Sequence, residues 1–392
     1  MLKKYRDKTK SPAEAAKVVQ NGDWVDFGFG NGFPELMDAA IAARKEELHD
    51  VKIRGGLVYR PSIQVVECDP VQESFQYYSW HLGAYERKMF NQGRLRFMPM
   101  LLRLMPAMYR DYLTVDVAVV PVSKPDDNGF CGLGLASYAW KHIIKKAHTV
   151  IFEINEHMPN LQGVDGSHRV CLEDADIIVE GEHAPLATNS YRAPSEADLQ
   201  IAKNVVAEIP SGATLSLGVG TVPFTIAKML AKSDRENLGC HTGTISDAFL
   251  ELYKAGKLTN SKKEINTGRS TWNLASGSQE CYDWLQEYPD LFYPADVDYV
   301  HNPRVMERIS HFISINGGVQ LDLMGQENAE SVGTRQLSGT GGQLDFLEGA
   351  FLSPGGEGYI AIESSHVDKK GVRHSNIIAQ IPGGSAVSAP RA

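Results

Sequence analysis

This 392-residue sequence has no apolar stretch long enough to cross a membrane, which requires roughly 18 consecutive residues. The richest stretch, residues 97–109, is interrupted by Pro99, Arg103 and Pro106. No apolar segment follows the charged start at residues 1–8, so we expect no secretory signal. The net charge of −9 argues against nonspecific attraction to nucleic acid or to an anionic membrane. These absences predict a cytoplasmic protein with neither a nucleic-acid partner nor a membrane partner.

Cysteine is scarce, and no two cysteines stand at the CxxC spacing of a zinc or redox site. The HExxH and GxSxG signatures and the Gly-Lys-Ser/Thr end of a Walker loop are absent as well. We therefore predict no metal site and no disulfide framework, and we expect each thiol to be reduced, small and buried. The five cysteines are Cys68, Cys131, Cys171, Cys240 and Cys281.

Glycine, in contrast, is plentiful and recurs at a fixed interval of 190 residues. The matched pairs are Gly22 and Gly212, Gly28 and Gly218, and Gly30 and Gly220. In both halves a helical pattern leads to a turn at the first glycine, and a short β-rich run, a Gly-x-Gly turn and another helical pattern follow. We therefore predict an α/β fold of two tandem, duplicated open α/β domains, with mostly parallel sheets and covering helices.

The expected boundary between the two domains is the polar segment 183–194, which contains two prolines. Ser195 is the expected N-cap of the following helix, with Asp198 as its capping-box partner. The N-terminal domain is predicted to cover residues 1–190 and the C-terminal domain residues 195–392.

Short β-rich runs alternate with helical patterns at residues 247–255 and 278–287, as parallel α/β sheets require. The other expected strands are residues 115–122, 149–154, 177–179, 313–315, 359–362 and 377–381. Ligands of open α/β sheets bind beyond the carboxyl ends of the strands. The candidate ligand loops are therefore residues 28–34, 218–223, 241–247, 316–318 and 338–346.

The loop at residues 338–346 is the densest in glycine. Consecutive glycines let backbone N–H groups converge on an anion or an oxyanion, although a flexible turn explains the same pattern. A dinucleotide site is disfavoured at Gly218 and Gly220, because the third glycine of GxGxxG is missing and Pro223 follows.

Three further features have a structural interpretation, and the first of them also has a functional one. His241 could act as a base, or it could be a structural hydrogen-bonding residue at a strand end. Asp247 is expected to cap the helix that follows it. The aromatic segment 77–81 is expected to pack in the core or at the domain interface.

Four stretches of the chain carry motifs in a characteristic order. Residues 125–131 read P-x-D-x-G-F-C, and residues 218–223 read GxGxxP. Residues 316–329 read N-x-x-x-x-x-D-x-x-G-Q-x-N-A, and residues 338–346 read S-G-x-G-G-Q-x-D-F. Together with residues 86–100, these motifs resemble the class I coenzyme A transferases of the acetyl-CoA hydrolase/transferase family. The similarity covers nearly the whole chain and is greatest to the relatives that use 4-hydroxybutyrate, or butyrate and acetate.

The resemblance implies a transfer of coenzyme A (CoA) from an acyl-CoA to a small carboxylate such as acetate, butyrate or 4-hydroxybutyrate. In this family a glutamate attacks the thioester, and backbone donors stabilise each oxyanion. It also implies an active site between two duplicated α/β domains, a homo-oligomer, and CoA as substrate with no permanently bound cofactor. The CoA-binding residues that it implies are Gly218, Val219, Gly220, Thr221, Val222, Gly318, Gly341 and Gly342.

The sequence departs from the family at the catalytic position. Where the family has His-Thr-Glu, this chain has His241, Thr242 and Gly243, so the nucleophilic carboxylate is missing. Three functions stay open: a transferase with a relocated nucleophile, an acyl-CoA hydrolase in which water takes the vacant space, and a CoA-binding protein without turnover. Relatives usually continue beyond the position of Ala392, so we also expect the C-terminal domain to be truncated at its end.

We predict that turnover of an acyl-CoA needs neither a metal ion nor NAD, because the sequence has the motifs of neither site. Dialysis against EDTA, followed by an assay in EDTA, should leave the rate of CoA release or transfer unchanged. A loss of activity that a divalent cation restores would contradict the family resemblance.

Overall fold

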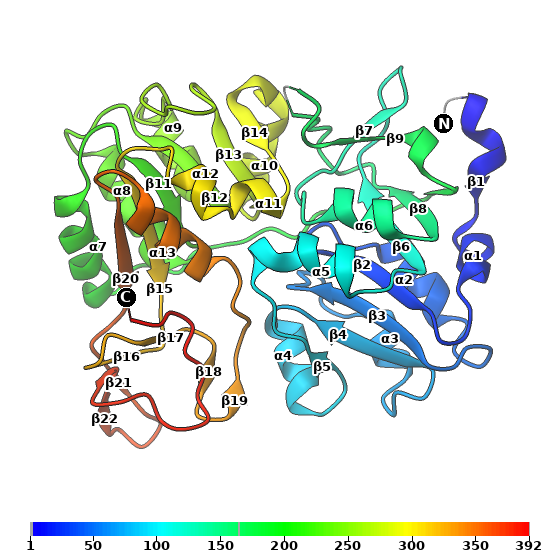
Figure 1. Ribbon diagram of the computed structural model, residues 1–392, viewed down its shortest axis with the longest axis horizontal. Coiled ribbons are helices and arrows are strands. Elements are labelled where there is room, and N and C mark those ends of the chain that lie inside the picture. The colour runs from blue at the N-terminus through cyan, green and yellow to red at the C-terminus, as the bar shows by residue number, and fades with distance from the viewer. Residues whose placement is uncertain (1–2, 164, 392) are drawn as a thin grey trace.

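A computed structural model describes residues 3–163 and 165–391 of the chain. Two large parallel sheets lie side by side, one built from each half of the chain, and helices pack over them (Figure 1). The N-terminal half is on the right of Figure 1, in blue to green, and the C-terminal half is on the left. This arrangement confirms the predicted α/β fold with two tandem, mostly parallel sheets.

The first sheet has eight strands in the order β1-β10-β8-β6-β2-β3-β4-β5, and every neighbouring pair is parallel. In this spatial order the strands are β1 (Thr9–Lys10), β10 (Ile177–Glu180), β8 (Thr149–Ile154), β6 (Val117–Val122), β2 (Trp24–Phe29), β3 (Val51–Gly56), β4 (Phe75–Ser79) and β5 (Arg96–Phe97). The α-helices of this half are α1 (Pro12–Ala15), α2 (Glu35–Ala42), α3 (Gln64–Cys68), α4 (Ala84–Asn91), α5 (Met105–Asp111) and α6 (Trp140–Lys146).

The second sheet has six strands in the order β14-β13-β12-β11-β15-β20, again all parallel. In spatial order they are β14 (Phe292–Pro294), β13 (Ser270–Ala275), β12 (Gly239–Ile245), β11 (Thr214–Leu217), β15 (Phe312–Gly317) and β20 (Glu357–Ala361). The α-helices of this half are α7 (Glu196–Glu208), α8 (Thr221–Ala231), α9 (Asp247–Lys254), α10 (Gln279–Glu287), α11 (Val297–Val300), α12 (Pro303–Met306) and α13 (Gln343–Leu352). No helix within the described residues is both long and apolar enough to span a membrane.

The two sheets share one strand order. Read across the sheet, the strands β8-β6-β2-β3-β4-β5 of the first sheet correspond one to one with β20-β15-β11-β12-β13-β14 of the second, and each pair has the same rank along its half of the chain. The equivalent strands β2 and β11 begin at Trp24 and Thr214, which reproduces the 190-residue interval of the glycines. The common order is the one expected of a duplicated domain.

Short strands complete the fold. β7 (Phe130–Gly132) and β9 (Arg169–Cys171) form an antiparallel pair in the N-terminal half. Below the second sheet in Figure 1, the end of the chain forms three small sheets. Their strands are β16 (Gln320–Asp322), β17 (Glu327–Asn328), β18 (Ser331–Val332), β19 (Arg335–Gln336), β21 (Ser365–Val367), β22 (Arg373–Ser375) and β23 (Ile377–Ile378). The expected strand at residues 377–381 is therefore limited to two residues.

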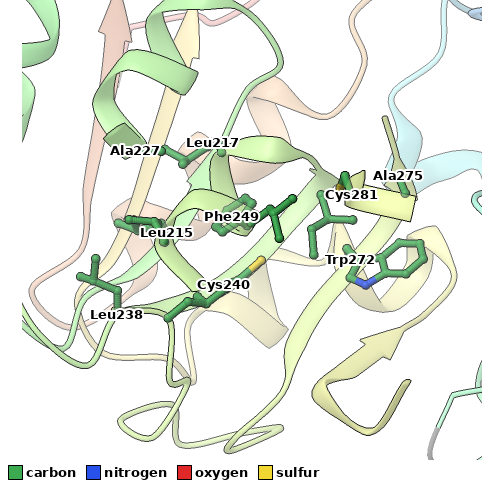
Figure 2. Packing of buried hydrophobic residues seen from close by; sticks show 14 of the residues in the cluster. Leu215, Leu217, Ala227, Leu238, Cys240, Phe249, Trp272, Ala275 and Cys281 are labelled. Carbon is green, nitrogen blue, oxygen red and sulfur yellow. The ribbon is translucent and has the colours of Figure 1, made fainter. Parts of the chain in front are cut away.

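The core of the C-terminal half is centred on β11, which is buried along its whole length. Strands of a parallel sheet that is covered on both faces are expected to be continuously apolar. Leu215 and Leu217 of β11 belong to one hydrophobic cluster with Cys240 of β12, Phe249 of α9 and Trp272 of β13 (Figure 2). This cluster holds β11 and β12 in place, and both strands end at the candidate site described below.

Two local expectations around residue 243 are wrong. Residues 241–245 belong to β12 and not to a loop, because Thr242 and Thr244 pair with β13 in parallel register. Asp247 does not cap its own helix, α9, whose N-cap is Ser246. Its buried carboxylate instead accepts a hydrogen bond from the backbone N–H of Ser278 at 3.0 Å, at the start of α10.

The cysteines are all free, as predicted. Cys131, Cys240 and Cys281 are buried, whereas Cys68 and Cys171 are only half-buried. The expectation of a buried thiol therefore holds for three of them and is wrong for two, both of which lie at the ends of short elements.

The segment between the two halves, residues 181–195, forms no helix or strand and connects β10 to α7 (Figure 1). At its end, the Ser195 hydroxyl accepts from the Asp198 N–H at 3.1 Å, and the Asp198 carboxylate accepts from the Ser195 N–H at 2.8 Å. The predicted capping box is confirmed. The domain limits at residues 190 and 195 stay a prediction.

The two halves are joined by backbone hydrogen bonds between residues 135–138 and the end of β13. The N–H of Ser137 donates to the carbonyl oxygen of Asn273 at 2.9 Å, and the N–H of Ala275 donates to that of Leu135 at 2.8 Å. The amide of Asn273 donates to the carbonyl oxygen of Tyr138 at 3.2 Å. A segment of the N-terminal half thus lies along the carboxyl end of a C-terminal strand.

A buried ion pair between two neighbouring strands stabilises the first sheet. Arg54 on β3 and Asp26 on β2 are at most 1% exposed. The Arg54 Nε donates to Asp26 Oδ1 at 3.1 Å, and the hydroxyl of Tyr109 on α5 donates to the same oxygen at 2.5 Å. Because each charge has a partner inside the protein, loss of one partner leaves the other buried and uncompensated.

We predict that Arg54→Met lowers stability by about 3–5 kcal/mol, the usual cost of an unpaired buried charge. The control is Arg304→Met, which removes an exposed pair with Glu307 at 3.0 Å and should cost less than about 1 kcal/mol. Urea denaturation followed by circular dichroism measures both variants. Equal midpoints for the two variants would contradict the assigned role of the buried pair.

Candidate active site

One cavity of about 200 Å³ lies where the two halves meet. Four parallel strands of the second sheet, β11, β12, β13 and β15, reach it at or near their carboxyl ends, which is where open α/β sheets bind ligands. The C-terminal residues around it are Ser216, Leu217, Gly218, Thr242, Gly243, Thr244, Asn273, Leu274, His301, Asn316, Gly341, Gly342, Gln343 and Phe346. The N-terminal half contributes Phe29, Leu57, His81 and Leu102.

The structure brings together four of the residues predicted for the site. Gly218, Gly243, Gly341 and Gly342 all line the cavity, although they are up to 124 positions apart in the sequence. The other predicted CoA-binding residues do not line it. Val219, Gly220, Thr221 and Val222 lie in the turn and first helical residues that follow Gly218, and Gly318 packs against Glu327 at the end of β15. Their contact with CoA stays a prediction.

The turn after β11 exposes backbone to a ligand. A β-carbon on Gly218 would meet no atom closer than 3.6 Å, so a ligand can approach the main chain there. Gly220, with φ of +146°, is the N-cap of α8 and supplies no side-chain cap. The first N–H groups of a helix without such a cap are free for a phosphate. The turn therefore has the features of an anion-binding loop.

The equivalent turn in the first half is closed. A β-carbon on Gly28 would lie 1.5 Å from the carbonyl oxygen of Gly32, because the chain folds back on itself there. Asn31, which we expected in a substrate-binding loop, instead donates to the Tyr282 hydroxyl and to the Ala187 carbonyl, each at 2.9 Å. This loop fastens the two halves together, and Phe29 before it reaches the cavity.

Gly243, the predicted position of the family's nucleophile, faces two side chains. A β-carbon on Gly243 would lie 3.0 Å from Cε2 of Phe346 and 3.1 Å from Cε1 of His301. The imidazole and the phenyl ring therefore occupy most of the space beside the glycine. Among the described residues, no aspartate or glutamate lines the cavity.

Charged groups lie behind His301. Its Nδ1 lies 3.3 Å from Oδ2 of Asp345, a fully buried carboxylate in the first turn of α13. Nη1 of Arg103, from the N-terminal half, lies 3.3 Å from the other oxygen of Asp345. The sequence contained Asp345 within the S-G-x-G-G-Q-x-D-F motif, but no signal pointed to His301. Only the fold brings it to Gly243.

The loop before α13 adds backbone donors. The N–H groups of Gly341 and Gly342 make no hydrogen bond within the described part of the chain, and both residues line the cavity. The predicted loop at residues 338–346 is helical from Gln343 onward. Two free N–H groups at a helix N-terminus can stabilise an oxyanion.

The other histidines near the site differ in role. His241 is buried behind the cavity, its Nε2 lies 2.9 Å from the carbonyl oxygen of Val300, and burial lowers its pKa to about 3. It is therefore a structural residue and not a base. Tyr77 and Trp80 are in the core, as predicted, but His81 lines the cavity, and burial lowers its pKa to about 4. His81 is thus a neutral group at neutral pH.

We predict that Gly342→Ala disturbs the site far more than Gly218→Ala. A β-carbon on Gly342 would lie 2.3 Å from Cε1 of His301, whereas Gly218 has room for one. Overpacking of this kind costs about 1–3 kcal/mol, so Gly342→Ala should lower the melting temperature and Gly218→Ala should not. Thermal unfolding of both variants measures the difference, and equal melting temperatures would contradict the packing described.

Known proteins resemble this chain over nearly its whole length. Residues 2–188 match the acetyl-CoA hydrolase/transferase N-terminal domain, and residues 277–392 match the C-terminal domain of the same family. A butyryl-CoA:acetate CoA-transferase from Anaerostipes caccae is 39% identical over 99% of this chain and 87% of its own length. A 4-hydroxybutyrate coenzyme A transferase from Clostridium kluyveri is 34% identical over 92% of this chain and 82% of its own.

A solved structure resembles the fold as well. The crystal structure of RipA from Yersinia pestis has a TM-score of 0.85 and 27% identity, and the match covers 98% of this chain and 87% of that one. Two matched domains, two strand-for-strand related sheets and full-length relatives agree. The chain therefore belongs to the acetyl-CoA hydrolase/transferase family.

Proposed function

We propose that this protein transfers coenzyme A between an acyl-CoA thioester and a short-chain carboxylate. The observation that carries the proposal is the cavity between the two halves, where exposed glycine turns meet a small, partly apolar space. CoA would lie along Gly218–Val222 and the start of α8, with its thioester beside Gly341 and Gly342. The names of the relatives support butyrate, acetate and 4-hydroxybutyrate as the acids.

The shape of the cavity fits a small acyl group. Phe29, Leu57 and Leu102 give it an apolar wall from the N-terminal half, whereas Asn273 and Asn316 supply amides from the C-terminal half. Apolar walls with a few polar groups are typical of small-molecule sites. The N–H groups of Gly341 and Gly342 would stabilise the oxyanion that forms when a thioester carbonyl is attacked.

Transfer has to proceed without a carboxylate on residue 243. The acceptor carboxylate can itself attack the thioester carbon, which breaks the C–S bond, expels CoA as a thiolate and leaves a mixed anhydride of the two acids. The thiolate then attacks the acceptor's carbonyl carbon and releases the first acid as a carboxylate. Both substrates must occupy the cavity together, so the kinetics are sequential and not ping-pong.

Hydrolysis of the acyl-CoA is the second candidate function. It is favoured by one observation, the absence of any described aspartate or glutamate from the cavity wall, which leaves water as a competing nucleophile. Both functions need the same CoA site.

The proposal is tested by incubating the protein with butyryl-CoA and labelled acetate. We expect labelled acetyl-CoA, with double-reciprocal plots that intersect. Release of free CoA alone would favour hydrolysis, and no product despite bound CoA would contradict both functions.

We further propose that the protein is a cytoplasmic homo-oligomer and that it has no permanently bound cofactor. Size-exclusion chromatography with light scattering tests the oligomer.

We predict that Gly243→Glu raises the rate of transfer by on the order of 100-fold or more, because an enzyme nucleophile splits one difficult step into two easier ones. The double-reciprocal plots should change from intersecting lines, the pattern of a sequential reaction, to parallel lines, the pattern of a ping-pong reaction. A side chain here must displace His301 and Phe346 slightly, so the double variant Gly243→Glu/His301→Ala should be faster still.

The control for this variant is Gly243→Gln, which has the same size but no nucleophile and should not gain activity. An unchanged rate of transfer in Gly243→Glu, with CoA binding intact in calorimetry, would show that residue 243 is not the position of the family's nucleophile.

A further inference from the structure

His301 lines the cavity, Asp345 lies behind it, and the transfer reaction uses neither residue. We propose that His301 is the general base that activates a water molecule for hydrolysis of bound acyl-CoA, with Asp345 as its positioning residue. The inference rests on the proposed function, because it requires acyl-CoA in the same cavity.

One edge of the His301 imidazole faces the part of the cavity beside Gly243. A β-carbon on Gly243 would lie 3.1 Å from Cε1 and 3.3 Å from Nε2 of His301, so this edge faces the position where the family's nucleophile belongs. Within the described residues, Nε2 of His301 makes no hydrogen bond with the protein. A base has to be within hydrogen-bond reach of the proton that it removes, and a water beside Gly243 meets that condition.

The opposite edge lies near a carboxylate. Nδ1 makes no hydrogen bond, but it lies 3.3 Å from Oδ2 of Asp345, which is fully buried and lies 3.3 Å from Nη1 of Arg103 through its other oxygen. The nearby carboxylate would favour the imidazolium that forms when Nε2 accepts a proton. Asp345 also lies in the first turn of α13, where the helix dipole favours a negative charge.

Other buried histidines of this chain lack that combination. His168 lies at hydrogen-bonding distance from Ser137 through Nδ1 and from the Gly134 carbonyl through Nε2, so both nitrogens are occupied. Nε2 of His241 is bonded to the Val300 carbonyl, and the residue does not line the cavity. His81 does line the cavity, but no carboxylate orients its ring. Among the cavity residues that the structure describes, His301 alone has a carboxylate within ion-pair distance of one ring nitrogen while its other nitrogen faces Gly243.

The hydrolytic step balances without any added reactant. The water oxygen forms a bond to the thioester carbon while Nε2 of His301 takes one of its protons, and the N–H groups of Gly341 and Gly342 face the oxyanion. Collapse of the tetrahedral intermediate breaks the C–S bond. CoA leaves as a thiolate that takes the proton from His301, and the product acid ionises.

This role separates hydrolysis from transfer. A carboxylate acceptor has no proton to lose at neutral pH, so its attack on the thioester needs no base, whereas attack by water does. Loss of His301 should therefore reduce hydrolysis much more than transfer, and the ratio of the two products should change.

The test compares His301→Gln with His148→Gln. The control residue forms a pair of the same length, with Nδ1 at 3.3 Å from Asp116, but it is exposed and outside the cavity. With butyryl-CoA alone, His301→Gln should lower kcat for CoA release by on the order of 100-fold, with little change in KM. With butyryl-CoA and labelled acetate, its ratio of free CoA to acetyl-CoA should fall. His148→Gln should match the unaltered protein in both assays.

Two further variants test the roles of the pair. Imidazole in the buffer should partly restore hydrolysis in His301→Ala, which a purely structural role would not predict. Asp345→Asn should lower kcat, and it should cause little further loss in His301→Gln, because residues that act as a unit are not additive.

The inference is overturned if the unaltered protein transfers CoA but releases none to water. It is also overturned if His301→Gln hydrolyses butyryl-CoA at an unchanged rate. Either result leaves the proposed transferase intact. Failure of the proposed function is distinct, because the unaltered protein would then bind CoA without producing acetyl-CoA from acetate.

Discussion

The site depends on the backbone pairing between residues 135–138 and the end of β13. Without the hydrogen bonds from Ser137 to Asn273 and from Ala275 to Leu135, the carboxyl ends of the second sheet would face solvent. Backbone bonds of this kind need no particular side chain. Asn273 adds a side-chain bond to the same segment and also lines the cavity, which links the domain contact to the site.

The residues at the catalytic position constrain one another. Gly342 has to be a glycine because His301 lies against it, and His301 occupies the space beside Gly243. Asp345 and Arg103 lie behind the imidazole. If residue 243 is the position of the family's glutamate, its loss does not leave a simple vacancy, because His301 and Phe346 occupy the adjacent space. In the proposed function, a substrate carboxylate or water then takes the place of a protein nucleophile.

Much of the fold followed from the sequence, because buried parallel strands and glycine turns are local patterns. The 190-residue interval predicted the duplication, and Ser195 predicted the start of α7. The grouping of Gly218, Gly243, Gly341 and Gly342 was also predictable from strand ends and motifs. His301 was not, since its role depends on α11 and α13 meeting in space. Residues 241–245 were taken for a loop because Gly243 and the threonines suggested one, but pairing with β13 makes them a strand.

The closed turn at Gly28 and the open turn at Gly218 give the two related halves unequal freedom to change. The first copy contributes a wall of the cavity, and in the proposed function its side chains could vary in size without altering how CoA is held. The second copy keeps the open main-chain surface along which CoA would lie. A duplicated fold of this kind can acquire a new acyl preference by substitutions in one half while the other half preserves recognition of the carrier.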